Sequence, residues 1–289
     1  MSVSEHPVAL TIEQRVGGAT VLLATVMALP LLDGLFVALL LAGTLETTVG
    51  MLETGLLVFG GSATVAVILA ELDESRRSMV RSVLLIGAGL IPLAALQAII
   101  APTIESALEL AIFQRFAGVV ILAIAARTVS AKVSDYLPSP GVIILLGLLA
   151  SVRPSALTVE LVVDGELLAR AAITAAIGVG FALAVALAAP ALRGVVDLDR
   201  FRFGSAVALG VFALPVVGVL DTDAPIALAV LIVSGLLAYS PDGGDEPEQD
   251  AEEPRSRRLI PTTRRKTPRV HPGCKRKHRA VSAIGGSAA

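Results

Sequence analysis

The chain has 289 residues, of which 55% are hydrophobic and 17% are charged, and its formal net charge is -2. Its mean hydropathy is +0.81. Folding such a sequence in water would leave too little polar surface to keep it dissolved, which excludes a soluble globular protein. The composition predicts an all-α, multi-pass bundle in the cell membrane, in contact with the lipid bilayer.

Eight apolar segments reach or approach about 20 residues, the length that crosses a bilayer. They run over 19–43, 51–71, 80–101, 107–126, 141–163, 168–191, 203–220 and 224–240. The last two are the shortest, so seven spans are the alternative. Because residues 1–18 carry Glu5 and Glu13 and no secretory signal, we expect the first segment to be a retained span. The predicted parts are a cytoplasmic N-terminal segment (1–18), a transmembrane domain (19–240) and a tail (241–289).

Arginine and lysine occur in alternate loops, which indicates the orientation. They lie in the tail and in loops 72–81, 127–140 and 192–202, whereas loops 44–50, 102–106, 164–167 and 221–223 contain none. Loops rich in these residues stay in the cytoplasm. The alternation therefore predicts eight spans with both termini in the cytoplasm.

Prolines recur within the predicted spans and suggest helix breaks. Pro30, Pro92, Pro154 and Pro215 fall in the first, third, fifth and seventh spans. Pro30 and Pro154 are separated by nearly the same number of residues as Pro92 and Pro215. This spacing indicates two four-span halves in a parallel repeat. The alternative is that proline is simply common in membrane helices.

Three charged residues fall near the centres of predicted spans, where a charge is costly and usually faces a protein interior or an aqueous cavity. They are Asp33, Arg115 and Arg153, the last beside Pro154. We expect them to lie at one level and to form a polar site suited to a small, anionic solute. The alternative is a structural pair between Asp33 and one arginine that fixes the packing of spans. Both interpretations require Asp33 to lie near Arg115 or Arg153. Weaker candidates are Gln97 and, near outer ends, Glu53, Glu109 and Glu160.

Small residues at helical spacing predict close approach of helices. They include Gly60-Gly61 in the second span and Ala172, Ala176 and Gly180 in the sixth. We expect packing within the bundle, with a homo-oligomer as the alternative. Gly60-Gly61 is also compatible with an unwound stretch lining a path.

Motifs for chemistry are missing from the membrane domain, so we expect no enzyme, no cofactor and no metal site. No nucleotide-binding GxxxxGK[ST] loop occurs, which argues against ATP-driven transport by this chain alone. The histidines, His6, His271 and His278, and the single cysteine, Cys274, all lie outside the predicted spans.

The tail differs sharply from the rest of the chain. Residues 242–253 are acidic and rich in proline and glycine, and residues 255–279 are strongly basic. Such composition is typical of disorder. The basic stretch is suited to anionic lipid headgroups or to nonspecific contact with nucleic acid. The alternatives are a solvated tail that only fixes topology, or a reading-frame artefact.

Three blocks of sequence carry a resemblance to a known family. HPVAL (6–10), GGATVLLATVMALPLLDGLFVALLLAG (17–43) and LVFGGSATVAVILAEL (57–72) resemble a haloarchaeal family of multi-pass membrane proteins of unknown function. The bias toward arginine, with only four lysines, fits a GC-rich genome and, together with the acidic residues, a halophile. The bundle also resembles, in architecture alone, small-solute exporters of the lysine-exporter type. We therefore expect a secondary transporter or exporter, with a non-transporting scaffold or lipid-interacting protein as the alternative.

Overall fold

The computed structural model describes residues 18–72, 75–153, 164–220 and 224–240. The chain divides into two compact units, Met1–Asp245 and Glu246–Ala289. The second unit lies outside the described residues, as do residues 1–17 and Pro154, so the predicted tail and one predicted helix break are not described. All the regular elements among the described residues are helices, and two isolated bridges, Leu108–Val152 and Val196–Tyr239, lie outside them. The all-α prediction is confirmed for them.

Four helices are long and apolar enough to cross a membrane alone, namely α6 (Arg76–Ser106), α7 (Leu110–Val129), α10 (Gly165–Leu192) and α11 (Leu198–Val217). Two bent pairs each qualify as one further span. The first joins α2 (Gly18–Leu32) to α3 (Leu35–Leu41) at 40°, and the second joins Thr48–Phe59 to Ser62–Glu71 at 46°. The second pair consists of α4 (Thr48–Thr54), the π-helix η2 (Gly55–Phe59), α5 (Ser62–Ala66) and the π-helix η3 (Val67–Glu71). Shorter elements are η1 (Thr44–Glu46), α8 (Ala131–Tyr136), α9 (Pro140–Ser151) and α12 (Ile226–Leu237).

The described helices therefore support four to six spans, fewer than the eight predicted. The predicted spans at 141–163 and 224–240 correspond to α9 and α12, which have 12 residues each. Twelve residues of α-helix extend about 18 Å, less than the ~30 Å of a bilayer core. The number of apolar residues did not reveal where these helices end.

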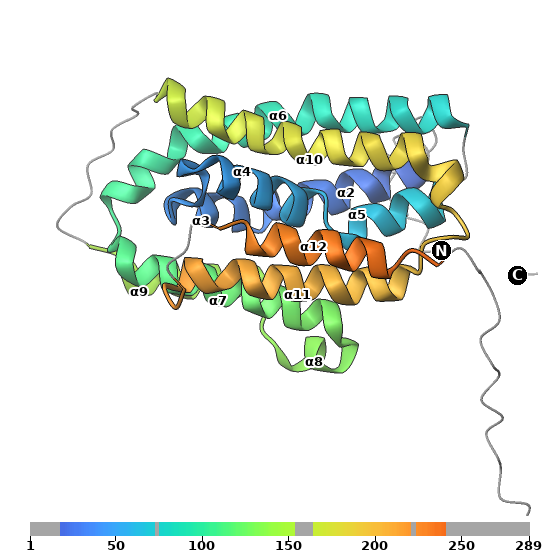
Figure 1. Ribbon diagram of the computed structural model, residues 1–289. Coiled ribbons are helices and arrows are strands. Elements are labelled where there is room, and N and C mark those ends of the chain that lie inside the picture. Colours follow the sequence, from blue (N-terminus) through green and yellow to red (C-terminus); the bar gives the residue numbers. More distant parts are fainter. Residues whose placement is uncertain (1–17, 73–74, 154–163, 221–223, 241–289) are drawn as a thin grey trace, which may run out of the picture. The chain divides into compact units, whose positions relative to one another are not determined.

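The helices form three layers within the first unit (Figure 1). Helices α6 and α10 pack along each other on one side, and α7, α9, α11 and α12 form the other side. The two bent pairs lie between these layers. Their packing relies on small residues, because Gly178 of α10 leaves room for Phe59 of η2, and Gly55 of η2 leaves room for Ile177.

The small-residue stripe of α10 is not the predicted one. Ala176 and Gly180 are exposed, whereas Ala171, Ala175, Gly178 and Ala182 are buried. Every choice of small residues at four-residue spacing looks alike in an alanine-rich helix, so the sequence did not identify the buried face.

Of the three described prolines at which helix breaks were predicted, Pro30 is the one that adjoins the bend of a helix pair. Pro30 lies two residues before the end of α2. Pro92 lies within the continuous helix α6, and Pro215 lies in the last turn of α11, before Gly218 ends the helix with a φ of 82°. The helix therefore continues through Pro92, where a break was predicted, whereas Pro215, like Pro30, lies two residues before a helix end. Membrane helices tolerate proline because neighbouring groups and local adjustments satisfy the freed backbone groups.

The bends of the two pairs lie beside each other. The rings of Phe36 and Phe59, which flank the two bends, are 5.3 Å apart between centroids. Polar groups released by the bends are bonded internally, as a membrane requires. The Thr64 hydroxyl donates to the Phe59 carbonyl at 2.8 Å, and the Gln97 amide donates to the Leu31 carbonyl at 2.7 Å. The second bend falls at Gly60-Gly61, where the sequence was compatible with unwinding.

Candidate functional site

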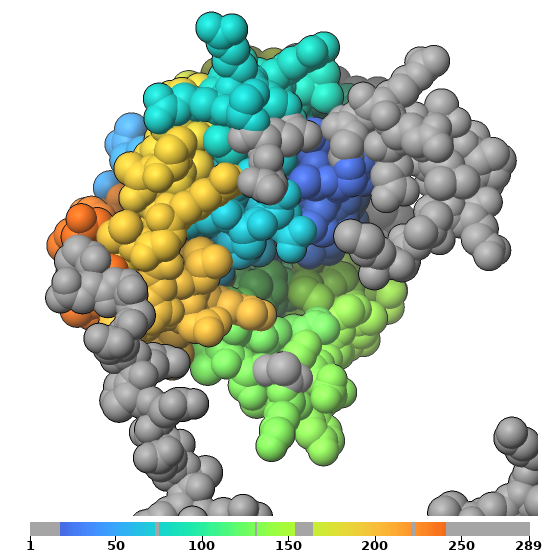
Figure 2. Space-filling view, turned by 90° about the vertical axis from the view of Figure 1, so that its right-hand side faces the viewer, coloured from blue at the N-terminus to red at the C-terminus, as the bar shows by residue number. Residues whose placement is uncertain are grey.

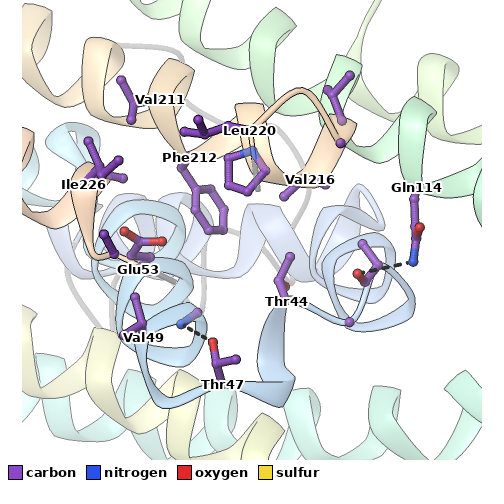
Figure 3. A pocket seen from close by; sticks show the side chains of 18 of the residues that line it. Thr44, Thr47, Val49, Glu53, Gln114, Val211, Phe212, Val216, Leu220 and Ile226 are labelled. Atoms are coloured by element: carbon purple, nitrogen blue, oxygen red, sulfur yellow. Dashed lines mark hydrogen bonds between the residues drawn. The ribbon is translucent and has the colours of Figure 1, made fainter. Parts of the chain in front are cut away.

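A cavity of about 700 Å³ opens at one end of the described helices. It lies where the turn between the two bent pairs meets the start of α7, the end of α11 and the start of α12 (Figure 3). Its polar lining consists of Thr44, Thr47, Glu53, Gln114 and Arg115. The remaining wall is largely apolar, with Phe212 facing Glu53 and the threonine-bearing turn (Figure 3).

The turn at residues 43–50 is held in one conformation. Gly43 has a φ of 75°, in the left-handed region that favours glycine. The Thr44 hydroxyl donates to the Leu39 carbonyl at 2.8 Å, and the Thr47 hydroxyl accepts from the Gly50 amide at 3.0 Å, which caps α4. A Cβ on Gly50 would lie 1.8 Å from the Thr44 carbonyl oxygen, so only glycine fits there. This turn fixes both threonines at the cavity wall.

Arg115 supplies the positive charge of the cavity. It lies in the second turn of α7 and is exposed. Among the described residues its guanidinium forms no ion pair and no hydrogen bond. The neighbouring Gln114 amide donates weakly to the Ala42 carbonyl at 3.5 Å, which ties α7 to the end of α3. Within this part of the chain, the guanidinium is thus available to bind a ligand.

Glu53 reaches the cavity from α4 and caps another helix. Glu53 is only 7% exposed. One carboxylate oxygen accepts from the Leu228 amide at 3.4 Å, and the carboxylate also accepts from the Ala227 amide. Both amides lie in the first turn of α12, whose N-cap residue, Pro225, provides no side-chain cap. A carboxylate at a helix N-terminus is stabilised by the unbonded amides and the helix dipole.

The structure does not bring Asp33, Arg115 and Arg153 together. Asp33 lies at the bend before α3, where its carboxylate accepts from the Leu35 amide at 3.0 Å. The cavity lies past the opposite end of α3, about 10 Å along a seven-residue helix. Among the described residues Asp33 forms no ion pair. The predicted contact between Asp33 and an arginine is therefore absent.

Arg153 lies at the end of α9, far from the middle of a span. Its backbone amide donates to the Ala107 carbonyl at 2.8 Å, and its guanidinium donates to the Leu108 carbonyl at 3.1 Å. It also pairs with Glu109 at 3.5 Å, with both side chains about half exposed. An ideal Cβ on Gly141, at the start of α9, would lie 3.7 Å from the Asp33 carbonyl oxygen. Asp33 and Arg153 therefore flank opposite ends of α9, separated by about 18 Å of helix.

The sequence pointed only weakly to Glu53, which is the second charged group of the cavity. It was a minor candidate near an outer end, where acidic residues usually meet water. Its role as a cap depends on α12, which lies far away in the sequence. Within the described ranges, no group of three histidine, cysteine, aspartate or glutamate side chains is placed to hold a metal ion.

Comparison with known proteins finds a match to a central part of the helical region. Residues 90–217 match the model of a family of unknown function, DUF5794. The match runs from within α6 to the end of α11 and includes Arg115, but it excludes Glu53 and α12. It also lies outside the three blocks that carry the haloarchaeal resemblance. No curated protein and no solved structure matches the chain.

Proposed function

We propose that this protein is a secondary transporter or exporter that moves a small anionic solute across the cell membrane. The supporting observation is the guanidinium of Arg115, which has no partner among the described residues and lies in the wall of a cavity of about 700 Å³. A charge inside a bundle is costly and marks solute pathways when it faces a cavity. The planar guanidinium suits carboxylates, phosphates and other oxyanions.

The balance of charge in the cavity favours an anion. Glu53 is bonded to the amides at the start of α12, so part of its charge is already offset. Among the described residues of the lining, the other polar groups, on Thr44, Thr47 and Gln114, are neutral. The bent pairs beside the cavity also support transport, because discontinuous helices commonly surround transporter binding sites.

The distribution of basic residues supports a cavity that opens away from the cytoplasm. The turn at residues 43–50 contains no arginine or lysine. At the other end of the helices, Arg76 and Arg77 begin α6 and Arg193 follows α10. Figure 2 views this other end, where cyan side chains from the start of α6 and green ones from the region of α7 and α8 project outward. The bias of basic loops toward the cytoplasm gives the orientation.

The ends of α12 support one further crossing by this short helix, and the proposal of eight crossings with both termini in the cytoplasm also requires α9 to complete one. Leu228, near the start of α12, lies at the cavity against Glu53. Tyr239, just past its end, pairs with Val196 before the start of α11. Residues around α12 thus run back beside α11. Helix α12 and the non-helical residues at its two ends would then together complete one crossing.

Transport in liposomes tests the proposed function. The purified protein would be reconstituted, and uptake of labelled nitrate, sulfate and L-glutamate would be measured for wild type and Arg115→Gln. We expect uptake of at least one anion, with a loss of about tenfold or more in Arg115→Gln, since a charge-assisted hydrogen bond contributes ~1.5–3 kcal/mol. Arg200→Gln is the control, because Arg200 does not line the cavity. Its guanidinium pairs with the Asp197 carboxylate at 2.9 Å. No uptake of any of the three by well-folded protein would refute the proposal and favour a non-transporting scaffold or lipid-interacting protein.

A further inference from the structure

Two charged groups of opposite sign line the same cavity but differ in their surroundings. Arg115 is exposed and has no partner among the described residues, whereas Glu53 is 7% exposed and bonded to α12. An anion held by Arg115 would share the cavity with the Glu53 carboxylate. Two negative charges in one partly desolvated cavity repel each other, and uptake of a proton by one of them relieves the repulsion.

We infer that Glu53 binds a proton when Arg115 binds the anion, so that each anion crosses the membrane together with a proton. This inference rests on the proposed transport of an anion. Binding equilibria that influence each other do so reciprocally, so protonation of Glu53 would strengthen anion binding by the same factor. Carboxylates within membrane bundles serve as proton carriers in transporters, so the chemistry is available to this side chain.

The hydrogen bonds of Glu53 allow it to gain a proton without releasing α12. A protonated carboxyl keeps a carbonyl oxygen that accepts from the Leu228 amide, and it gains an O–H that can donate into the cavity. The step is balanced: the carboxylate takes a proton from the bulk on the loading side and returns it on the release side. The O–H donor could then contact the bound anion, which an ionised carboxylate would repel.

Few other charges among the described residues could replace Glu53 in this role. Helix α12 contains no ionisable residue, and neither does the part of α11 that lines the cavity. Helix α10 packs against α4 and carries Glu166 and Arg170, which pair with each other. Glu46 in η1 is exposed and does not line the cavity. Arg115 of α7 is thus the charged partner that shares the cavity with Glu53.

Simultaneous measurement of anion and proton movement tests the inference. Liposomes containing the full chain and the pH indicator pyranine would hold equal potassium on both sides with valinomycin, which clamps the membrane potential at zero. The external anion would then be replaced by nitrate, sulfate or L-glutamate at an unchanged potassium concentration. Wild type should acidify the lumen in step with anion influx. In Glu53→Gln the ratio of protons to anions should fall toward zero, because glutamine keeps an acceptor for α12 but cannot carry a proton.

Glu166→Gln is the matched control, because Glu166 is an acidic residue that lies outside the cavity lining and should leave the ratio unchanged. Anion influx without acidification in wild type would overturn the inference while leaving the proposed transport intact. An unchanged ratio in Glu53→Gln would also overturn it. Absence of influx for all three anions would instead refute the transport on which the inference rests. If Glu53→Gln fails to fold, the wild-type ratio alone decides.

Discussion

The contact between α10 and the π-helix η2 gives the sharpest stability prediction, through Gly178→Ala. An ideal Cβ on Gly178 would lie 2.4 Å from the Phe59 Cβ and 2.9 Å from the Gly55 carbonyl oxygen. Carbon atoms in contact are normally ~3.5–4.0 Å apart, so α10 and η2 would have to separate by about 1 Å or more. Both obstructing atoms are fixed to the backbone, so no side-chain rotation can relieve the overlap.

Overpacking of this kind typically costs about 1–3 kcal/mol, and the absence of a flexible neighbour places Gly178→Ala at the upper end. For a domain of this size, a loss of about 2–3 kcal/mol lowers the melting temperature by roughly 4–12 °C. Because the chain contains no tryptophan, we would follow unfolding in detergent by circular dichroism at ~222 nm, the signal of the helices.

Gly180→Ala on the same helix is the matched control. No atom lies within 4 Å of its ideal Cβ, so the added methyl group meets open space. Alanine is favoured over glycine within a helix by about 0.8–1.0 kcal/mol, so this variant should melt at the same temperature as wild type or slightly higher. Equal melting temperatures for the two variants would refute the close packing of α10 on η2.

Three further substitutions test the cavity and its surroundings by the same melting and uptake measurements. Glu53→Ala should lower stability by about 0.5–2 kcal/mol, since it removes the cap of α12, and an unchanged melt would contradict that role. Gly50→Ala should prevent proper folding, because its Cβ would lie 1.8 Å from the Thr44 carbonyl oxygen, so a monodisperse, stable variant would contradict the turn. Arg153→Ala should cost about 1 kcal/mol and leave anion uptake unaltered, because its ion pair with Glu109 is half exposed. A severe loss of uptake in a folded Arg153→Ala protein would contradict this prediction and indicate that Arg153 takes part in anion binding.

Part of the candidate site could be predicted from the sequence. A charge inside an apolar segment costs free energy in a membrane unless the charge faces a protein interior or a cavity. This reasoning selected Arg115, which lines the cavity. The same reasoning failed for Arg153 because it assumed that residues 141–163 form one helix. Helix α9 ends at Ser151, and the backbone then pairs with the connection between α6 and α7. Arg153 therefore lies at a helix end, where water and a carboxylate are within reach.

Composition and the pattern of apolar segments by themselves determined that this is an all-α chain suited to a membrane, because a bilayer allows only backbone structures that bond internally. They also identified the regions of the helices other than the short elements η1 and α8, which fall in predicted loops. Only the tertiary structure decided which faces are buried, where α9 ends, and that Glu53 of α4 caps α12. These features depend on contacts between residues far apart in the sequence, which cannot be predicted from local composition. For the same reason, Arg115 and Glu53 line one cavity, whereas Asp33 lies at the far end of α3.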